Sequence, residues 1–187
     1  MNAKATTLRA LALAGSLLVL PAVAATPASA ASATCPVVFW GSLPKTSEMM
    51  TTQALTNIRT GQHACYDRIV FDISAGAGGI VGYRVSYGSV FTEGKGDPVP
   101  LAGDADLRIV ILAPAYDPSG PTYDPATVPN VSGYSTFREV AFAGTFEGQT
   151  TVGLGVRARL PMRAFVLSGP GNGQRLVVDV AHRWTAF

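Results

Sequence analysis

Two histidines, His63 and His182, are the side chains of this sequence best suited to acid–base chemistry, and Cys65 and Asp67 lie near the first of them. A serine or cysteine hydrolase needs a nucleophile, a base and a third group that orients the base. His63 and Cys65 are two positions apart, so in a strand they point the same way without forming a triad. The sequence contains no Gly-x-Ser-x-Gly. We therefore predict that the protein is not an enzyme and has no catalytic residues.

A metal site is the second chemistry that these side chains allow. His63, Asp67 and His182 would supply two imidazoles and a carboxylate, a set typical of zinc, if their strands were adjacent. Histidines at strand ends are more often hydrogen-bonded surface groups, so we predict no metal and no cofactor. Glycoside cleavage needs two acids held across a cleft. Asp104, Asp106 and Glu147 are instead interpreted as solvated loop acids.

Arginine dominates the basic residues near the C-terminal end. Arg157, Arg159 and Arg163 lie close together, and Arg175 and Arg183 follow. The guanidinium fork binds carboxylates and phosphates well, so this run is a candidate contact for an anionic cell-wall polymer. The alternative is a structural role, in which the arginines shield an edge strand or pair with acids.

A proline-rich loop carries the second candidate binding surface. Between Ala113 and Tyr134 lie five prolines and two Tyr-Asp-Pro sequences, which begin at Tyr116 and Tyr123. Long loops in compact domains are often functional, and prolines stiffen them. Exposed tyrosines on such a loop can stack on sugar rings or contact a partner. In the alternative, the tyrosines fold back and cover a sheet edge.

A repeated strand pattern sets the framework for these residues. Residues 68–73 (Arg-Ile-Val-Phe-Asp-Ile) return as residues 175–180 (Arg-Leu-Val-Val-Asp-Val). Alternation places Ile69, Phe71 and Ile73 on one apolar face and the two charged residues on the other, as in a half-buried antiparallel strand. If the copies pair in register, Arg68 faces Asp179 and Asp72 faces Arg175, which gives two ion pairs. The alternative places the copies in opposite sheets.

The remaining pattern predicts an all-β fold, a single-domain antiparallel β-sandwich of about seven to eight strands. Expected strands, separated by Gly- and Pro-rich turns, cover residues 54–60, 66–73, 82–90, 107–113, 137–143, 150–157, 162–167 and 174–181. Residues 48–55 are the best candidate for a short helix. Gly153-Leu154-Gly155 superficially matches a dinucleotide fingerprint, but no helix can follow because of Pro161. These glycines therefore indicate a bulge or close packing.

The N-terminal residues predict export. Lys4 and Arg9 precede an apolar run, and Ala28-Ser29-Ala30 is a typical cleavage site, with an alternative cut after Ala33. We expect residues 1–30 to be a disordered signal peptide, 31–53 an N-terminal extension and 54–187 the folded domain. No later stretch is long enough for a membrane span. Without Lys4 and Arg9, twelve basic residues balance twelve acidic ones, so nucleic acid is not an expected partner.

The two cysteines, Cys35 and Cys65, are expected to form one disulfide that ties the extension to the domain. In the alternative, Cys35 is a lipidated first residue, but Ser32-Ala33-Thr34 is a poor lipobox. Both possibilities place the protein outside the cytoplasm, secreted or associated with the cell envelope.

Three blocks carry a resemblance to a known family: residues 59–71 (Arg-Thr-Gly-Gln-His-Ala-Cys-Tyr-Asp-Arg-Ile-Val-Phe), Phe146-Glu147-Gly148 with Gly153-Leu154-Gly155, and residues 176–182 (Leu-Val-Val-Asp-Val-Ala-His). Together they resemble the actinobacterial AMIN-like domain, a relative of the AMIN domain of cell-wall amidases and type IV pilus secretins. The resemblance covers most of the chain from about Leu55 on. It implies a bacterial β-sandwich that sits in the cell envelope; the better-known AMIN domains localise proteins by binding peptidoglycan and have no catalytic activity.

The resemblance also implies a set of polar positions, which either bind a ligand or stabilise the fold: Arg59, His63, Asp67, Arg68, Glu147 and His182. With Tyr116, Tyr123, Arg157 and Arg159 from the loop and the basic run, these are the candidate ligand-binding residues. The expected partner is a cell-wall glycan, with an envelope protein as the alternative, and the oligomeric state stays open. Because no amidase sequence follows, we do not expect the module to target a fused enzyme.

Overall fold

The computed structural model describes residues 35–184, so the expected signal peptide lies outside the described residues. The strands are β1 (Lys45–Ser47), β2 (Leu55–Gln62), β3 (Tyr66–Ile73), β4 (Gly82–Tyr87), β5 (Ala105–Leu112), β6 (Tyr116–Asp117), β7 (Gly120–Pro121), β8 (Phe137–Phe146), β9 (Gln149–Val156), β10 (Met162–Ser168) and β11 (Gln174–Ala181). One 3-10 turn, η1 (Pro125–Thr127), lies between β7 and β8. No helix in this part of the chain is long and apolar enough to cross a membrane.

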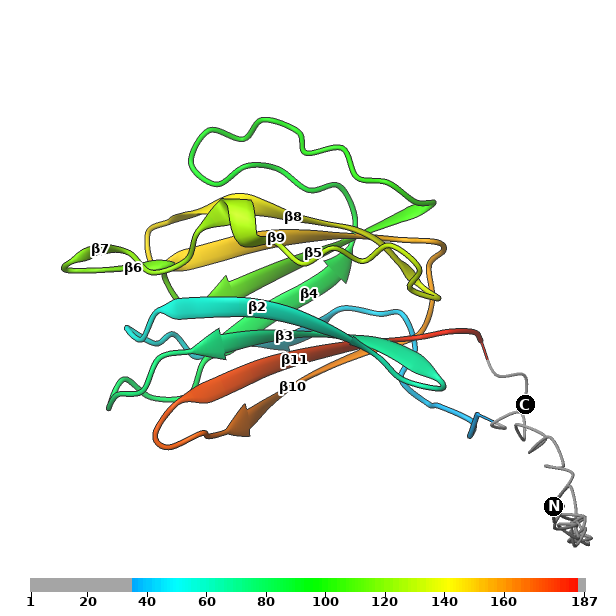
Figure 1. Ribbon diagram of the computed structural model, residues 1–187, viewed down its shortest axis with the longest axis horizontal. Coiled ribbons are helices and arrows are strands. Elements are labelled where there is room, and N and C mark those ends of the chain that lie inside the picture. Colours follow the sequence, from blue (N-terminus) through cyan, green and yellow to red (C-terminus); the bar gives the residue numbers. More distant parts are fainter. Residues whose placement is uncertain (1–34, 185–187) are drawn as a thin grey trace, which may run out of the picture. The chain divides into compact units, whose positions relative to one another are not determined.

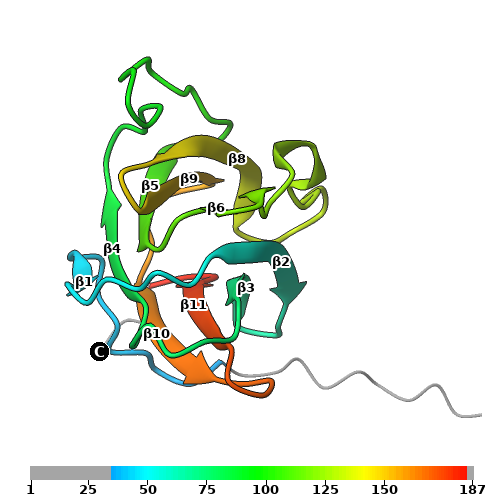
Figure 2. The same ribbon diagram turned by 90° about the vertical axis from the view of Figure 1, so that its left-hand side faces the viewer.

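The strands form two antiparallel sheets that face each other (Figures 1 and 2). The five-stranded sheet has the order β1-β4-β5-β9-β8 and the four-stranded sheet the order β10-β11-β3-β2, while β6 and β7 make a separate ribbon. The all-β antiparallel prediction is therefore confirmed, although the strand number is higher than expected. The additional strands β1, β6 and β7 are too short to show an alternating pattern. The short helix considered for residues 48–55 was wrong, because this segment is irregular until β2 begins.

Alternation along the strands builds the core between the sheets. Ile69 and Phe71 of β3 and Leu176 of β11 point inward and are fully buried, as are Ile109 of β5 and Leu154 of β9 on the facing sheet. Burying a side chain of this size contributes about 1.5–3 kcal/mol. The core thus follows from the period-two pattern that the sequence shows.

The repeated strands β3 and β11 are neighbours, paired antiparallel with Arg68 opposite Asp179 and Asp72 opposite Arg175. Arg68 binds Asp179 (Nε–Oδ1 2.7 Å), which confirms one of the two expected ion pairs. The other was wrong. Asp72 instead accepts two hydrogen bonds from Arg59 of β2, and Arg175 donates to the carbonyl of Ser168.

The proline-rich loop, residues 113–134, closes the sandwich between the edge strands β2 and β8 (Figure 2). Its carbonyl at Pro114 accepts from Leu55 N (2.7 Å), and the hydroxyl of Tyr134 donates to Thr60 Oγ1 (2.9 Å). Tyr123 is buried in the core, 5% exposed, with its ring 5.3 Å from that of Phe142. The loop therefore covers a sheet edge, one of the two roles considered for it.

A second long loop, residues 88–104, crosses the outer face of the five-stranded sheet and appears in green above β8 in Figure 1. A Cβ atom at Gly155 of β9 would lie 2.1 Å from the carbonyl oxygen of Ala102, so only glycine leaves room for this loop. The expected close packing at these glycines is confirmed.

Candidate functional site

The outer face of the four-stranded sheet carries a group of charged side chains that the strand pattern places outward. We call it the arginine face; four arginines and two aspartates lie on it, namely Arg59 of β2, Arg68 and Asp72 of β3, Arg163 of β10, and Arg175 and Asp179 of β11. Since β3 and β11 are antiparallel copies of one pattern, each aspartate stands beside the arginine of the other copy. The charges therefore form two clusters, one toward each end of the sheet.

The first cluster is centred on Asp179, whose side chain is fully buried. Arg68 donates to it through Nε (2.7 Å) and Nη2 (2.9 Å), and Arg163 donates through Nε (2.8 Å). Hydrogen bonding to Asp179 raises the pKa of the Arg68 guanidinium. Two cations around one carboxylate leave this cluster with one positive charge in excess.

Aromatic rings surround the guanidinium of Arg163. Its central carbon lies 4.3 Å from the ring centroid of Trp40, 5.1 Å from that of Phe165 and 5.7 Å from that of Tyr66. Cation–π contacts of this kind are worth about 0.5–2 kcal/mol each, more where water is excluded. They hold Arg163 in one orientation at the surface.

Trp40 reaches this position because the preceding residues are tied down. We call residues 35–42 the N-terminal strap. The Cys35–Cys65 disulfide, which was expected, holds its start. Met162 N of β10 donates to the Gly41 carbonyl (2.8 Å), and Arg159 donates to Ser42. The disulfide indicates an extracytoplasmic protein and removes Cys65 as a nucleophile.

A pocket of about 460 Å³ opens between the strap and the sheet. We call it the Trp40 pocket; it is lined by Pro36, Val38, Trp40, His63, Ala64, Cys65, Tyr66 and Arg163. The ring of His63 stacks on that of Tyr66, with centroids 4.4 Å apart. Aromatic walls with one cationic group are typical of a site for a small ligand.

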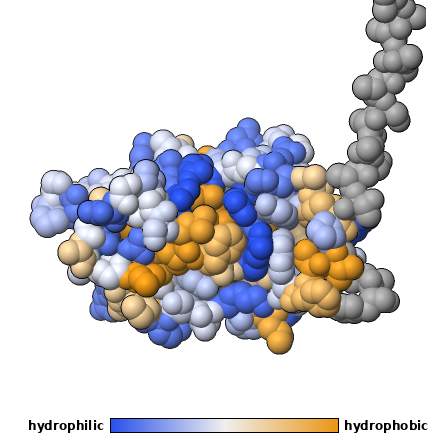
Figure 3. Space-filling view, turned by 90° about the horizontal axis from the view of Figure 1, so that it is seen from below, coloured by the Kyte–Doolittle hydropathy of each residue, from blue (hydrophilic) through white to orange (hydrophobic). Residues whose placement is uncertain are grey.

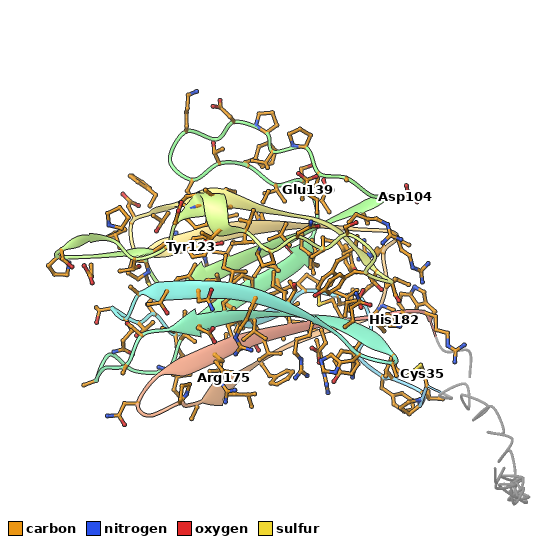
Figure 4. All side chains as sticks on the ribbon, viewed as in Figure 1. Cys35, Asp104, Tyr123, Glu139, Arg175 and His182 are labelled. Atoms are coloured by element: carbon orange, nitrogen blue, oxygen red, sulfur yellow. A yellow bond between two sulfur atoms is a disulfide. The ribbon has the colours of Figure 1, made fainter. Side chains whose placement is uncertain are left out.

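The second cluster lies further along the sheet, where Figure 4 shows Arg175 on the lower sheet at a distance from Cys35. Arg59 binds Asp72 in a bidentate manner, through Nε and Nη2 at 2.9 Å each, which raises the pKa of Arg59. Between the clusters, Phe165, Val177 and Val70 form an apolar row across three strands. The view from below likewise shows an apolar band between two hydrophilic bands (Figure 3).

Asp67 and His182 meet, but inside the sandwich rather than at a binding surface. The fully buried carboxylate of Asp67 accepts from Thr136 N (2.5 Å) and Phe137 N (3.3 Å), and it lies 3.0 Å from His182 Nε2. Arg157 donates to the His182 carbonyl. This arrangement anchors the start of β8 to the start of β3 and to the residue that follows β11.

His63 does not join that pair, because its ring lies on Tyr66 instead. Consequently the three residues considered for a metal do not converge. Within residues 35–184 no group of three or more His, Cys, Asp or Glu side chains could hold a metal ion.

The other candidate residues are scattered. Arg159 packs its guanidinium over the Tyr87 ring at 5.3 Å and holds the strap, and Glu147 is exposed in the β8–β9 turn with φ 48°. Tyr116 is exposed, unlike Tyr123. It lines the Tyr116 groove, a hollow of about 590 Å³ formed by Met50, Thr51, Thr52, Gly78, Pro114, Tyr116, Asp117, Pro118 and Gly148.

Comparison with protein families gives one match, to the model of the AMIN-like domain, over residues 53–182. The chain belongs to the AMIN-like domain family. An AMIN-like domain is an all-β module that is typically non-catalytic, and no enzyme family matches. Searches of curated proteins and of solved structures find no match. The N-terminal strap precedes the matched residues, so the Trp40 pocket combines the AMIN-like domain with a segment outside it.

Sequence reasoning missed Trp40, and it named Arg163 and Arg175 in the basic run without counting them among the candidate ligand-binding residues. A usable signal existed for Arg175, because it is the first residue of the repeated strand and shares a face with Asp179. Trp40 follows Cys35 by five positions, so the expected disulfide already placed it near Tyr66. The position of Arg163 depends on the pairing of β10 with β11, which the sequence of the AMIN-like domain does not show.

Proposed function

We propose that this AMIN-like domain protein is a non-catalytic, secreted module that binds the bacterial cell envelope through the arginine face, and that its ligand is peptidoglycan or a glycan attached to it. The observation that carries this proposal is the excess of positive charge on the outer face of the four-stranded sheet. Four guanidinium groups lie there against two carboxylates. The formal net charge of the chain is only +2, so this concentration is local.

The geometry of the face suits an extended anionic polymer. Along β3 and along β11 the charged residues of the two clusters are four residues apart, or about 13 Å. Arginine binds carboxylates and phosphates through a planar fork, and Arg175 forms no ion pair within residues 35–184. A polymer lying along the strands would contact both clusters and the apolar row between them.

A sedimentation assay with insoluble purified cell wall tests the proposal. The double variant Arg59→Gln/Arg175→Gln removes two charges from the second cluster, and we expect it to weaken wall binding at least about tenfold at low salt, since hydrogen bonds to charged groups are worth about 1.5–3 kcal/mol each. Wild-type binding should also fall as salt rises.

The matched control is Arg108→Gln/Arg138→Gln, which removes two exposed arginines from the five-stranded sheet. Its wall binding should stay close to wild type. Absence of wild-type binding at low and at moderate salt would reject the proposal, and so would an equal loss in both double variants.

A protein partner is the second candidate, and the Tyr116 groove favours it. Met50, Pro114, Tyr116 and Pro118 give the groove a mostly apolar lining at the end of the sandwich that carries β6 and β7. A photo-crosslinking side chain at Thr52, on the rim, should then yield an adduct with one defined envelope protein. The same side chain at exposed Ser89 serves as the control, and equal adducts at both positions, or none, would reject this function.

A further inference from the structure

We propose that the Trp40 pocket binds a sugar ring that carries a carboxylate, with the ring against the aromatic walls and the carboxylate on Arg163. This inference rests on the proposed function and deepens it, because it names the chemical class of the glycan unit and the place where it binds. The pocket is built partly by the N-terminal strap, which lies outside the residues matched to the AMIN-like family. It is therefore a feature of this chain's own sequence.

The strap makes the pocket a preformed site. The disulfide holds one end, the hydrogen bond from Met162 to Gly41 holds the other, and Trp40 lies between them. Both ties join the strap to the four-stranded sheet, at Cys65 before β3 and at the start of β10. A site whose walls are already in place loses little conformational entropy when a ligand binds.

The walls suit a pyranose ring. Trp40 and Tyr66 meet edge to face, with centroids 5.8 Å apart and planes at 68°, and His63 extends the Tyr66 wall. The C–H groups on one side of a pyranose form an apolar patch that packs on aromatic rings, while its hydroxyl groups stay toward water. The volume of about 460 Å³ accommodates one or two rings rather than a long segment of polymer.

Arg163 supplies the charge. Its Nε and Nη2 groups bind Asp179, but no hydrogen bond within residues 35–184 uses Nη1, and its side chain is 39% exposed. Arg68 binds the same carboxylate, so Asp179 neutralises only one of the two guanidinium groups. Arg163 can therefore bind a second carboxylate from the pocket side. A phosphate polymer would satisfy Arg163 equally well but has no sugar ring of its own to pack against the exposed parts of the aromatic walls.

A fluorescence titration tests this assignment. The chain has two tryptophans, so Trp184→Phe leaves Trp40 as the reporter. The ligands are the disaccharide of N-acetylglucosamine and N-acetylmuramic acid, and N,N′-diacetylchitobiose (called chitobiose below), which has the same N-acetylated rings without the carboxylate. We expect a saturable change in Trp40 emission with the first and at least tenfold weaker binding of the second.

Two variants in the Trp184→Phe background assign the contacts. Arg163→Gln should bring the affinity for the acidic disaccharide down to that for chitobiose, whereas Arg108→Gln on the other sheet should leave the tenfold difference intact. Reduction of the disulfide in the folded protein should weaken binding of both sugars, because the strap is then released. Circular dichroism confirms that each sample stays folded.

Several results would overturn the inference. The inference fails if the two sugars bind with equal affinity, or if Arg163→Gln keeps the preference for the acidic disaccharide. It also fails if only a glycerol phosphate polymer displaces the bound disaccharide. Wall sedimentation that depends on Arg59 and Arg175, without any Trp40 response to the sugars, would overturn this inference and leave the proposed function standing. Disaccharide binding without wall sedimentation would support the sugar site in the Trp40 pocket and would reject wall binding through the arginine face.

Discussion

Asp67 and Asp179 show how two buried carboxylates on adjacent strands are stabilised in different ways. Asp67 points into the sandwich, where two backbone N–H groups and His182 surround it. Asp179 points outward, where Arg68 and Arg163 provide the partners. A buried carboxylate without partners costs several kcal/mol, so both sets of contacts are required for stability. The difference assigns Asp67 to the fold and Asp179 to the candidate binding face.

Replacement of Asp67 tests the first assignment. Asp67→Asn keeps the shape but removes the charge that the two backbone donors and His182 face, so we expect the free energy of unfolding to fall by about 3 kcal/mol. Urea unfolding measures it. Asp104→Asn, in an exposed loop, should change stability by less than about 0.5 kcal/mol. A change in Asp67→Asn as small as that of the control would contradict the structural role.

The strap and the proline-rich loop depend on contacts with other elements, because neither belongs to the two main sheets. Removing the disulfide by Cys35→Ser/Cys65→Ser should lower the free energy of unfolding by about 3–4 kcal/mol, the loop-closure entropy for a sequence separation of 30. Denaturant unfolding measures this loss. Mass spectrometry of the unreduced wild-type protein should show two hydrogens fewer than the reduced form, and two free thiols would contradict the pairing.

The two tyrosines of the proline-rich loop should respond differently to truncation. Tyr123→Ala should destabilise the protein by about 3–5 kcal/mol, because it leaves a cavity beside Phe142. Tyr116→Ala, at an exposed site, should change stability by less than about 0.5 kcal/mol. Thermal unfolding of both variants makes the comparison. Similar losses would mean that the loop does not pack as described.

At the scale of the whole molecule, two tyrosines of β4 link the five-stranded sheet to β10 and to the segment just before it. Tyr83 donates to the Ala164 carbonyl (2.9 Å), and Tyr87 donates to the Leu160 carbonyl (2.8 Å) and accepts from Leu160 N (3.0 Å). Burial raises the pKa of both side chains above the ordinary value of 10.0. The folded state therefore favours the neutral phenol more strongly than the unfolded chain does.

This link predicts alkaline unfolding. The stabilising contribution of the two neutral tyrosines is complete below about pH 10, the pKa of a tyrosine in the unfolded chain. It is lost as the pH rises through the raised pKa values of Tyr83 and Tyr87 in the folded protein. We expect the midpoint of thermal unfolding to fall above about pH 10, together with rising tyrosinate absorbance. Tyr83→Phe/Tyr87→Phe should be less stable at neutral pH and should show a smaller alkaline decline. An equal decline in the double variant would contradict the assignment.

The sequence alone determined the fold class, the inward faces of the strands, the disulfide and the outward position of the repeated Arg and Asp residues. These follow from period-two alternation and from the cysteine count, which are properties of the chain itself. Only the tertiary structure decided that Arg59, not Arg175, binds Asp72, that Tyr123 is buried while Tyr116 is exposed, and that Trp40 covers Arg163. Each of these depends on which distant segment lies beside a given side chain, and that position results from the packing of β2, β10, the loop and the strap onto the sheets.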